Sequence, residues 1–256
     1  MQDNTVIVDY EAGPPALQFA PVFNVAVPFI DRHIDEGRAE KTAIRTIEET
    51  VTYGELAERV NRCGNYFKSL GIGVGDRVLM IVKDCPEFIY AFFGAIKAGV
   101  IPVPVNTMLR VDDYRFLMDD SECTVLITAD EGLRGGRSVA LKENADRALQ
   151  SCPEVQTVFV VKRTGGEVNW SEGRDHWYHD AVAAEKPECQ PELMDAEDPL
   201  FILYTSGSTG KPKGVEVSHY NVMRLFEATR GWYDFNERDV WTMFHSYAFD
   251  FSVWEI

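Results

Sequence analysis

The sequence predicts an α/β fold, an open and mostly parallel sheet of βαβ units covered by helices on both faces. In the first half of the chain, short apolar runs that suit buried strands alternate with helical patterns; in order, these segments are residues 77–82, 86–98, 100–105, 111–119 and 123–128. The apolar residues 200–204 suit one more buried parallel strand. Ligands of such sheets bind at the carboxyl ends of the strands, and we expect the loop that begins at Thr205 at that edge.

The segments before the first βαβ unit have local signals of their own. Residues 1–23 are expected to form an N-terminal arm, polar and then rich in proline, that wraps loosely over the surface. An amphipathic helix, a hairpin and a capping box at a helix start are predicted at residues 24–37, at residues 43–45 with 51–53, and at Thr52 with Glu55. The glycines of residues 71–75 follow a helix and precede a strand, so they predict a simple turn rather than a dinucleotide loop.

The pattern is weaker after residue 130, where we expect further helices and strands around one polar excursion. The helices are predicted at residues 142–149, 177–185 and 220–229, the strands at residues 157–161 and 240–244, and the excursion at residues 163–174.

Composition limits the classes of partner and compartment. The 256 residues carry a net charge of −16, which argues against duplex nucleic acid and anionic membranes as partners. The five cysteines are scattered without a CxxC pair or a Cys/His cluster, so we expect neither a disulfide framework nor a cysteine metal site. No signal peptide or membrane span is evident, and a cytoplasmic protein is expected.

The most distinctive stretch, LFILYTSGSTGKPKGVEVSH at residues 200–219, predicts a loop that binds nucleotide phosphates. Its glycines permit positive φ and let main-chain N–H groups converge on an anion, its hydroxyls donate hydrogen bonds or bind a metal, and its lysines supply positive charge; these residues are Gly207, Gly210 and Gly214, Thr205, Ser206, Ser208 and Thr209, and Lys211 and Lys213. It is not the common P-loop, because Pro212 follows Gly210-Lys211 and the helix starts late, with Ser218 as its N-cap.

The string YTSGSTGKPKGV resembles the signature loop of the adenylate-forming superfamily, which includes acyl-CoA synthetases, peptide-synthetase adenylation domains and luciferases. The resemblance implies that the loop holds the β- and γ-phosphates of ATP, with Thr205 as a ligand of Mg²⁺, while a carboxylate attacks the α-phosphate. It also implies that residues 24–256 are an incomplete large N-terminal domain of that fold.

Different parts of the chain resemble different branches of this superfamily. Residues 24–126 are similar to benzoate-type aryl-CoA ligases, residues 127–215 to acetyl-CoA synthetase, and residues 218–256 to peptide-synthetase adenylation domains. The resemblance therefore describes a mosaic, either natural or designed.

Arg134-Gly135-Gly136-Arg137 places two guanidinium groups beside a flexible glycine pair, which suits a terminal phosphate. The resemblance to acetyl-CoA synthetase implies that these four residues bind the nucleotide end of coenzyme A. A solvated basic loop is the alternative.

The segment FHSYAFDFSVWEI contains the candidates for substrate recognition. Asp250 lies between aromatic residues, so its carboxylate should be partly desolvated and require a cationic partner. The resemblance to adenylation domains implies that Asp250 pairs with a substrate α-amino group, beside Phe249. It also implies that His245 lines the carboxylate pocket as the catalytic candidate, whereas the alternative is an ordinary core histidine.

Taken together, these resemblances imply an ATP-dependent, AMP-forming carboxylate–CoA ligase that uses ATP, Mg²⁺ and coenzyme A on acetate, an aryl acid or an amino acid. The family's adenine, ribose and catalytic-lysine motifs are absent from these 256 residues, so we expect the chain alone to be inactive. An amino-acid adenylation domain is one alternative. The other is a non-catalytic or designed fragment with at most nucleotide binding.

Overall fold

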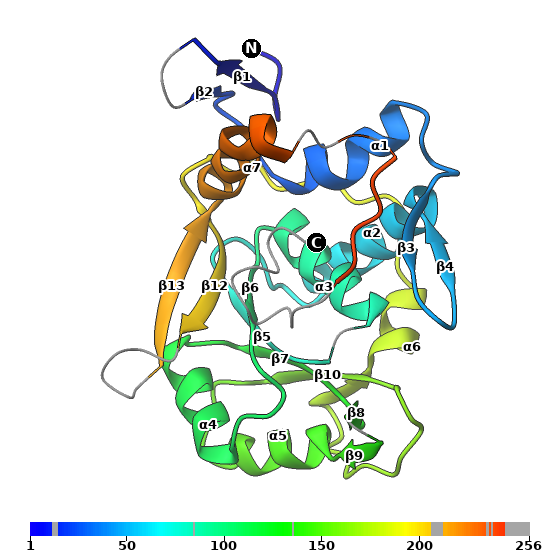
Figure 1. The fold of residues 1–256 in the computed structure, drawn as a ribbon. Helices are drawn as coiled ribbons and strands as arrows, with labels where there is room; N and C mark the ends of the chain where they lie inside the picture. Colours follow the sequence, from blue (N-terminus) through cyan, green and yellow to red (C-terminus); the bar gives the residue numbers. More distant parts are fainter. Residues whose placement is uncertain are drawn as a thin grey trace.

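A five-stranded parallel sheet, with the strand order β11-β10-β7-β5-β6, lies at the centre of the computed structural model (Figure 1). The structure describes residues 1–11, 15–83, 85–134, 136–205, 212–233, 236 and 238–243, and only the main chain of residue 134. The elements of the first half are β1 (Val6–Asp9), β2 (Ala16–Phe19), the π-helical turn η1 (Val27–Asp31), α1 (Arg32–Asp35), β3 (Thr42–Arg45), β4 (Thr50–Thr52), α2 (Tyr53–Ser69), β5 (Arg77–Ile81), α3 (Pro86–Lys97), β6 (Ile101–Pro104), α4 (Val111–Asp120) and β7 (Val125–Ala129). The second half contains β8 (Gly132–Arg134), β9 (Arg137–Val139), α5 (Leu141–Leu149), β10 (Thr157–Val161), β11 (Asp175–Trp177), α6 (Tyr178–Ala183), β12 (Pro199–Thr205), β13 (Lys213–Ser218) and α7 (His219–Tyr233).

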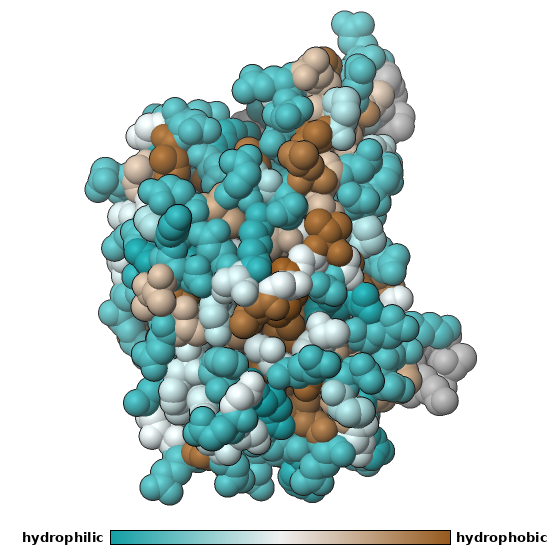
Figure 2. Space-filling view, turned by 180° about the vertical axis from the view of Figure 1, so that it is seen from behind, coloured by the Kyte–Doolittle hydropathy of each residue, from teal (hydrophilic) through white to brown (hydrophobic). Residues whose placement is uncertain are grey.

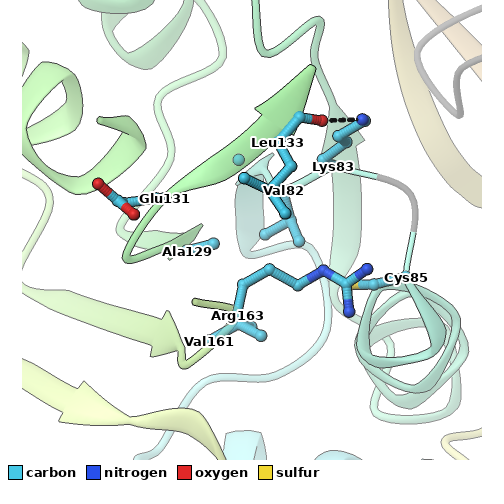
Figure 3. Close-up of a pocket in the computed structure, with 9 residues that line it drawn as sticks. Val82, Lys83, Cys85, Ala129, Glu131, Leu133, Val161 and Arg163 are labelled. Atoms are coloured by element: carbon cyan, nitrogen blue, oxygen red, sulfur yellow. Dashed lines mark hydrogen bonds between the residues drawn. The ribbon is translucent and has the colours of Figure 1, made fainter. Parts of the chain in front are cut away.

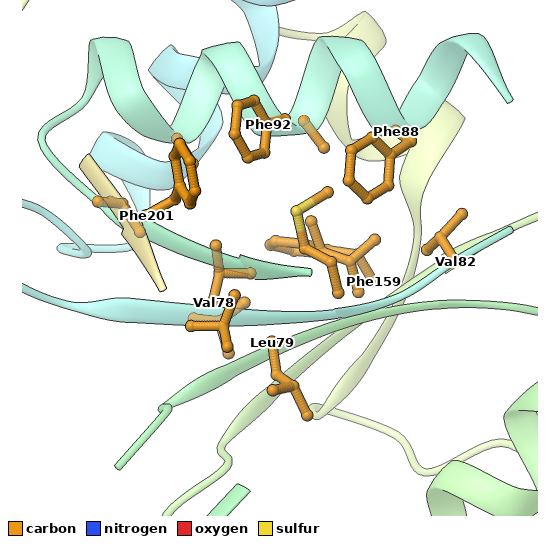
Figure 4. Close-up of a cluster of buried hydrophobic side chains, with 14 of the residues drawn as sticks. Val78, Leu79, Val82, Phe88, Phe92, Phe159 and Phe201 are labelled. Carbon is orange, nitrogen blue, oxygen red and sulfur yellow. The ribbon is translucent and has the colours of Figure 1, made fainter. Parts of the chain in front are cut away.

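Helices cover both faces of this sheet, as the sequence predicted. Helix α3 lies on one face with α2 and α6 behind it, whereas α4 and α5 lie on the other (Figure 1). Figure 4 shows the layer beneath α3, where Phe88 and Phe92 pack over the sheet above Val78 and Phe159, while Leu79 points to the opposite face. All these side chains are buried, so the sheet is covered as a parallel sheet requires.

Helices α2 and α3 approach closely because both carry a glycine at their contact. A Cβ atom on Gly94 would lie 2.8 Å from the Cβ of Cys63 and 3.1 Å from the main-chain nitrogen of Gly64. Such distances leave no room for a side chain, so the glycines set the separation of the two helices.

Several local predictions are confirmed. Strands β3 and β4 form the predicted antiparallel hairpin, and α2 begins with the capping box. In that box Thr52 donates its N–H to Glu55 Oε2 at 2.8 Å, and the Glu55 N–H donates to Thr52 Oγ1 at 3.2 Å. Gly71 and Gly75 have φ values of 75° and 85° in the predicted turn. The polar excursion at residues 163–174 contains no helix or strand.

The N-terminal arm differs from the prediction, because it contains the antiparallel hairpin β1–β2 rather than loose chain. The hydroxyl of Tyr10 donates to Glu227 Oε2 at 2.5 Å, which ties the hairpin to α7. The buried imidazole of His219 adds a second link, since its Nδ1 accepts the Val25 N–H at 3.0 Å. Burial lowers the pKa of His219 to about 4, so this acceptor is neutral at pH 7.

Two other predictions needed correction, and strands β8, β9 and β11 were not predicted. The helix expected at residues 24–37 begins at Val27 with a π-helical turn. The strand predicted at residues 240–244 is wrong for residues 240–243, which form no strand, and Phe244 lies outside the described residues. The apolar side chains of this segment suggested a buried strand. In the structure Val240 is 91% and Trp241 51% exposed, so these side chains do not pack against a sheet.

The surface agrees with the acidic, polar composition. Most of the face in Figure 2 is hydrophilic, with apolar side chains gathered along its middle. None of the helices in the described part of the chain is long and apolar enough to cross a membrane. All five cysteines are free and buried, and burial raises the pKa of Cys63 to about 12, so this thiol stays protonated and unreactive.

Candidate functional site

The ends of the phosphate-loop stretch are held together by the antiparallel hairpin β12–β13. Its register pairs Thr205 with Lys213 and Tyr204 with Gly214. A Cβ atom on Gly214 would lie 3.2 Å from Ile202 Cγ2 and 3.4 Å from the Tyr204 ring, so glycine suits this close crossing. Thr205 and Lys213 are both exposed. The remaining candidates of the loop, Ser206, Gly207, Ser208, Thr209, Gly210 and Lys211, lie outside the described residues.

Strand β12 is not part of the parallel sheet, contrary to the prediction for residues 200–204. Its ladder partner is β13, which returns antiparallel after the loop, and β12 lies next to β6 (Figure 1). Two strands joined by a short loop pair most readily with each other, because a hairpin closes less chain than a crossover does.

The position of the loop also differs from the prediction. The hydroxyl of Tyr204 donates to Asp120 Oδ2 at 2.8 Å, and Asp120 is the last residue of α4. The turn after α4 lies beside the start of β5, since Arg77 Nε donates to the Ser121 carbonyl at 2.8 Å. The Thr205 end of β12 therefore lies at the amino ends of β5 and β7, so the expectation of a carboxyl-edge loop is wrong.

Helix α7 starts where the sequence predicted. Ser218 Oγ accepts the N–H of Asn221 at 3.3 Å, and Asn221 Oδ1 accepts the N–H of Ser218 at 3.0 Å. This reciprocal cap confirms Ser218 as the N-cap, and it separates the phosphate loop from the helix by the whole of β13.

The arginine motif forms a second hairpin, β8–β9, directly after β7. Its register pairs Arg134 with Arg137, and Gly136 has φ 76° in the two-residue turn between them. Arg137 is exposed, whereas Gly135 lies outside the described residues. Directly opposed positions of an antiparallel ladder have Cβ atoms about 5 Å apart, so the register brings the two arginine positions together on one hairpin.

A small cavity of about 50 Å³ lies beneath this hairpin, at the carboxyl ends of β5, β7 and β10 (Figure 3). Among its lining residues are two cations that the sequence analysis missed, Lys83 and Arg163. The Lys83 ammonium donates to the Leu133 carbonyl of the hairpin, as the dashed line in Figure 3 shows. The space holds a few water molecules at most, so a larger anion would lie on the hairpin rather than in the cavity.

The missed cations had a usable signal. Lys83 and Arg163 each follow the end of a parallel strand by two residues, and side chains at such strand ends meet at one edge of the sheet.

The candidates His245, Phe249 and Asp250 lie outside the described residues.

The two hairpins that carry candidate site residues, β12–β13 and β8–β9, lie at opposite ends of the parallel sheet. The Thr205 end of β12 lies near α4, and hairpin β8–β9 lies across the sheet from it (Figure 1). The candidate phosphate-loop residues Thr205 and Lys213 are therefore separated from the candidate arginine motif by the width of the sheet.

Comparison with known proteins adds a family. Residues 31–256 match the family described as AMP-binding enzyme. Acetyl-coenzyme A synthetase of Alkalilimnicola ehrlichii is 45% identical over 239 residues, which cover 91% of this chain and 35% of that protein. The corresponding synthetase of Halorhodospira halophila is 48% identical over 201 residues, covering 76% of this chain and 31% of that protein.

A solved structure of a CoA ligase is similar to this chain in fold. The anthranilate CoA ligase AuaEII, crystallised with anthranoyl-AMP, superimposes with a TM-score of 0.69 and 26% identity, over 80% of this chain and 36% of that one. The chain thus spans about a third of the length of these relatives. The likeness to acetyl-coenzyme A synthetase, expected for residues 127–215, extends over 91% of the chain. By sequence and by fold, the chain belongs to the AMP-binding enzyme family, within the adenylate-forming superfamily.

Proposed function

We propose that this chain carries the ATP-phosphate and coenzyme A sites of an AMP-forming ligase that converts a small carboxylic acid, acetate in the first instance, into its coenzyme A thioester. The observation that carries the proposal is that two separate hairpins with candidate phosphate-binding residues, β12–β13 and β8–β9, lie at opposite ends of the parallel sheet. An enzyme with two phosphate-bearing substrates requires two such positions. The identity to acetyl-coenzyme A synthetases supports acetate as the acid.

The chemistry of the first hairpin fits a triphosphate. Thr205 and Lys213 face each other in the ladder and are exposed, so a hydroxyl and an ammonium group are available at the mouth of the loop. We assign residues 205–214 to the β- and γ-phosphates of ATP and Thr205 to Mg²⁺, which takes oxygen ligands together with substrate phosphates. When bound, the ion neutralises charge on the phosphates.

The second hairpin fits a terminal phosphate. Arg134 and Arg137 are opposite each other across a two-residue turn, and each guanidinium group can form a bidentate pair with phosphate oxygens. We assign Arg134, Gly135, Gly136 and Arg137 to the nucleotide end of coenzyme A. An anion of this size fits on the exposed hairpin, because the cavity beneath it is too small.

The reaction has two balanced steps. A carboxylate oxygen attacks the α-phosphorus of ATP and pyrophosphate leaves; the thiolate of coenzyme A then attacks the acyl carbon and AMP leaves. The solved relative was crystallised with an acyl-adenylate, which supports the first product. We assign His245 and Phe249 to the carboxylate pocket, with His245 orienting the attacking carboxylate. All five cysteines of the chain are free, in keeping with a cytoplasmic enzyme.

The effect of replacing Asp250 distinguishes a plain carboxylic acid from an amino acid as the substrate. The unmodified full-length protein is expected to exchange pyrophosphate into ATP with acetate, more slowly with benzoate, and not with a panel of amino acids. Asp250→Ala should leave acetate-dependent exchange unchanged or faster, because an unpaired carboxylate in an apolar pocket is costly. Exchange that depends on an amino acid and is abolished by Asp250→Ala would establish the amino-acid adenylation alternative. No exchange with any acid would indicate a non-catalytic protein.

The phosphate loop gives a second test. Replacing Thr205, Ser206 or Lys211 should each weaken ATP binding by about 1–3 kcal/mol, the cost of a hydrogen bond to a charged group. AMP lacks the β- and γ-phosphates, so its affinity should be nearly unchanged, and calorimetric titration with both nucleotides compares them directly. Equal losses for ATP and AMP would contradict the assignment of the loop to the outer phosphates.

A further inference from the structure

The carboxylate of Asp130, the first residue after β7, accepts hydrogen bonds from four main-chain N–H groups. Oδ1 accepts from Glu131 at 2.7 Å and from Arg163 at 2.8 Å, and Oδ2 accepts from Gly165 at 2.7 Å. The N–H of Thr164 is shared between the two oxygens, at 3.3 and 3.2 Å. Asp130 is 1% exposed, so these bonds form away from water.

The donors belong to segments that follow two neighbouring strands. Glu131 leads into hairpin β8–β9, whereas Arg163, Thr164 and Gly165 form the loop after β10. Burial raises the pKa of Asp130, but the four N–H donors more than offset this, and the net pKa lies below its ordinary value. The side chain is therefore an ionised carboxylate that ties the two segments together with charge-assisted bonds.

The main chain of Asp130 strengthens the same junction. Its N–H donates to the Val161 carbonyl at 3.0 Å, and its carbonyl accepts the N–H of Lys142 at 3.3 Å. The residue thus joins the end of β10, the start of α5 and the start of the arginine hairpin.

The hairpin itself depends on such ties, because its strands are only three residues long and a short isolated hairpin is marginally stable. Two further contacts hold it in place. Thr164 Oγ1 donates to Glu131 Oε2 at 2.7 Å, and Lys83 donates to the Leu133 carbonyl from the other side. Both lie on the surface, whereas the Asp130 carboxylate holds the base of the hairpin from within.

We propose that Asp130 is a positioning residue for coenzyme A, because it fixes the hairpin that carries Arg134 and Arg137, the residues that we assign to the terminal phosphate. The inference rests on the proposed function of this hairpin. Bidentate recognition of a phosphate tolerates an error of only about 0.5 Å in the position of its donors. A hairpin released at its base would keep its two positive charges but lose this geometry.

Asp130→Asn in the full-length protein tests the proposal. The asparagine side chain has one oxygen that accepts hydrogen bonds and one NH₂ group that can only donate. The variant therefore loses the hydrogen bonds that either Oδ1 or Oδ2 of Asp130 accepts. The readout is the ratio of kcat/KM for coenzyme A to kcat/KM for 3′-dephospho-coenzyme A. We expect this preference to fall by about tenfold to a hundredfold, while acid-dependent pyrophosphate exchange stays within about twofold.

Asp175→Asn is the matched control, since Asp175 is also a buried aspartate but bonds Lys142 and Arg174 instead of the hairpin. It should destabilise the protein and leave the coenzyme preference unchanged. Gly165→Ala is the milder second variant. Gly165 has a φ of +80°, which alanine disfavours, so the substitution should displace the N–H group that donates to Oδ2 of Asp130. We expect it to lower the preference about threefold, and it decides the question if Asp130→Asn does not fold.

Two outcomes would overturn the inference. One is an unchanged preference in the Asp130 variant, or in Gly165→Ala where that variant decides. The other is an equal loss in Asp175→Asn, which would show an effect of stability alone. The combined change Arg134→Ala with Arg137→Ala separates this from the proposed function: if that double variant keeps the preference, the assignment of the hairpin to coenzyme A is itself wrong.

Discussion

Replacing Arg134 and Arg137 together by alanine is expected to raise the Kd of coenzyme A at least about 100-fold in the full-length protein. Each hydrogen bond to a charged phosphate contributes about 1.5–3 kcal/mol, so the pair is expected to contribute about 3–6 kcal/mol. The affinity for dephospho-coenzyme A should change little, because this molecule lacks the phosphate that we assign to the hairpin. Calorimetric titration of both ligands, with ATP as a third, measures the three affinities.

The control for this prediction removes the same charge elsewhere. Arg115 and Arg147 are exposed on the neighbouring helices α4 and α5, and the ion pair of Arg115 with Asp112 is a surface contact. Arg115→Ala with Arg147→Ala lowers the net charge by the same two units and should leave coenzyme A binding within about twofold, apart from weak long-range effects. Similar losses in the two double variants would mean that net charge, and not the hairpin, controls affinity.

Lys142→Met is expected to lower the free energy of unfolding by about 3–5 kcal/mol, the usual cost of removing one partner of a buried ion pair. The Lys142 side chain is fully buried, and its ammonium lies 2.7 Å from Asp146 Oδ1 and 2.8 Å from Asp175 Oδ2. Without it, two carboxylates share the one guanidinium group of Arg174. Urea denaturation of the variant and the unmodified chain measures the loss.

The exposed residue Lys186 gives the matched control, and Lys186→Met should change the free energy of unfolding by less than about 0.5 kcal/mol.

The pH dependence of stability supplies a second readout for Lys142→Met. Burial raises the pKa of Asp175, but bonds from Arg174 and Lys142 more than offset it and hold the pKa below its ordinary value. The stability from this depressed pKa is present above the unfolded value of about 4 and is lost as the pH falls through the folded value.

Loss of Lys142 raises the pKa of Asp175, so the deficit of the Met variant should shrink as the pH falls below about 4. A deficit that is constant from pH 7 to pH 3 would show that the lost packing of the lysine stem, and not its charge, accounts for the change.

Several features whose partners are close in sequence could be predicted, although the hairpins β1–β2 and β8–β9 were not. The capping box of Thr52 with Glu55, the cap at Ser218 and the hairpin β3–β4 each depend on contacts within about ten residues, and all are present. The alternating strands and helices of residues 77–129 also needed no distant information, because each strand is apolar throughout and each helix has its own periodicity. The phosphate-loop and arginine motifs could be singled out as candidates for the same reason, because the residues of each motif are contiguous in the sequence.

The sequence by itself therefore determined the α/β class, most helices and strands, and the residue types of the two hairpins that we propose to bind phosphate groups. Only the tertiary structure decided which edges these hairpins occupy. The Tyr204–Asp120 hydrogen bond joins residues 84 positions apart and places the phosphate loop at the amino ends of β5 and β7. Asp130 is one acidic residue in the sequence, and its role follows from N–H groups 33 to 35 residues away. Such contacts depend on how strands order themselves in the sheet, which local propensity does not encode.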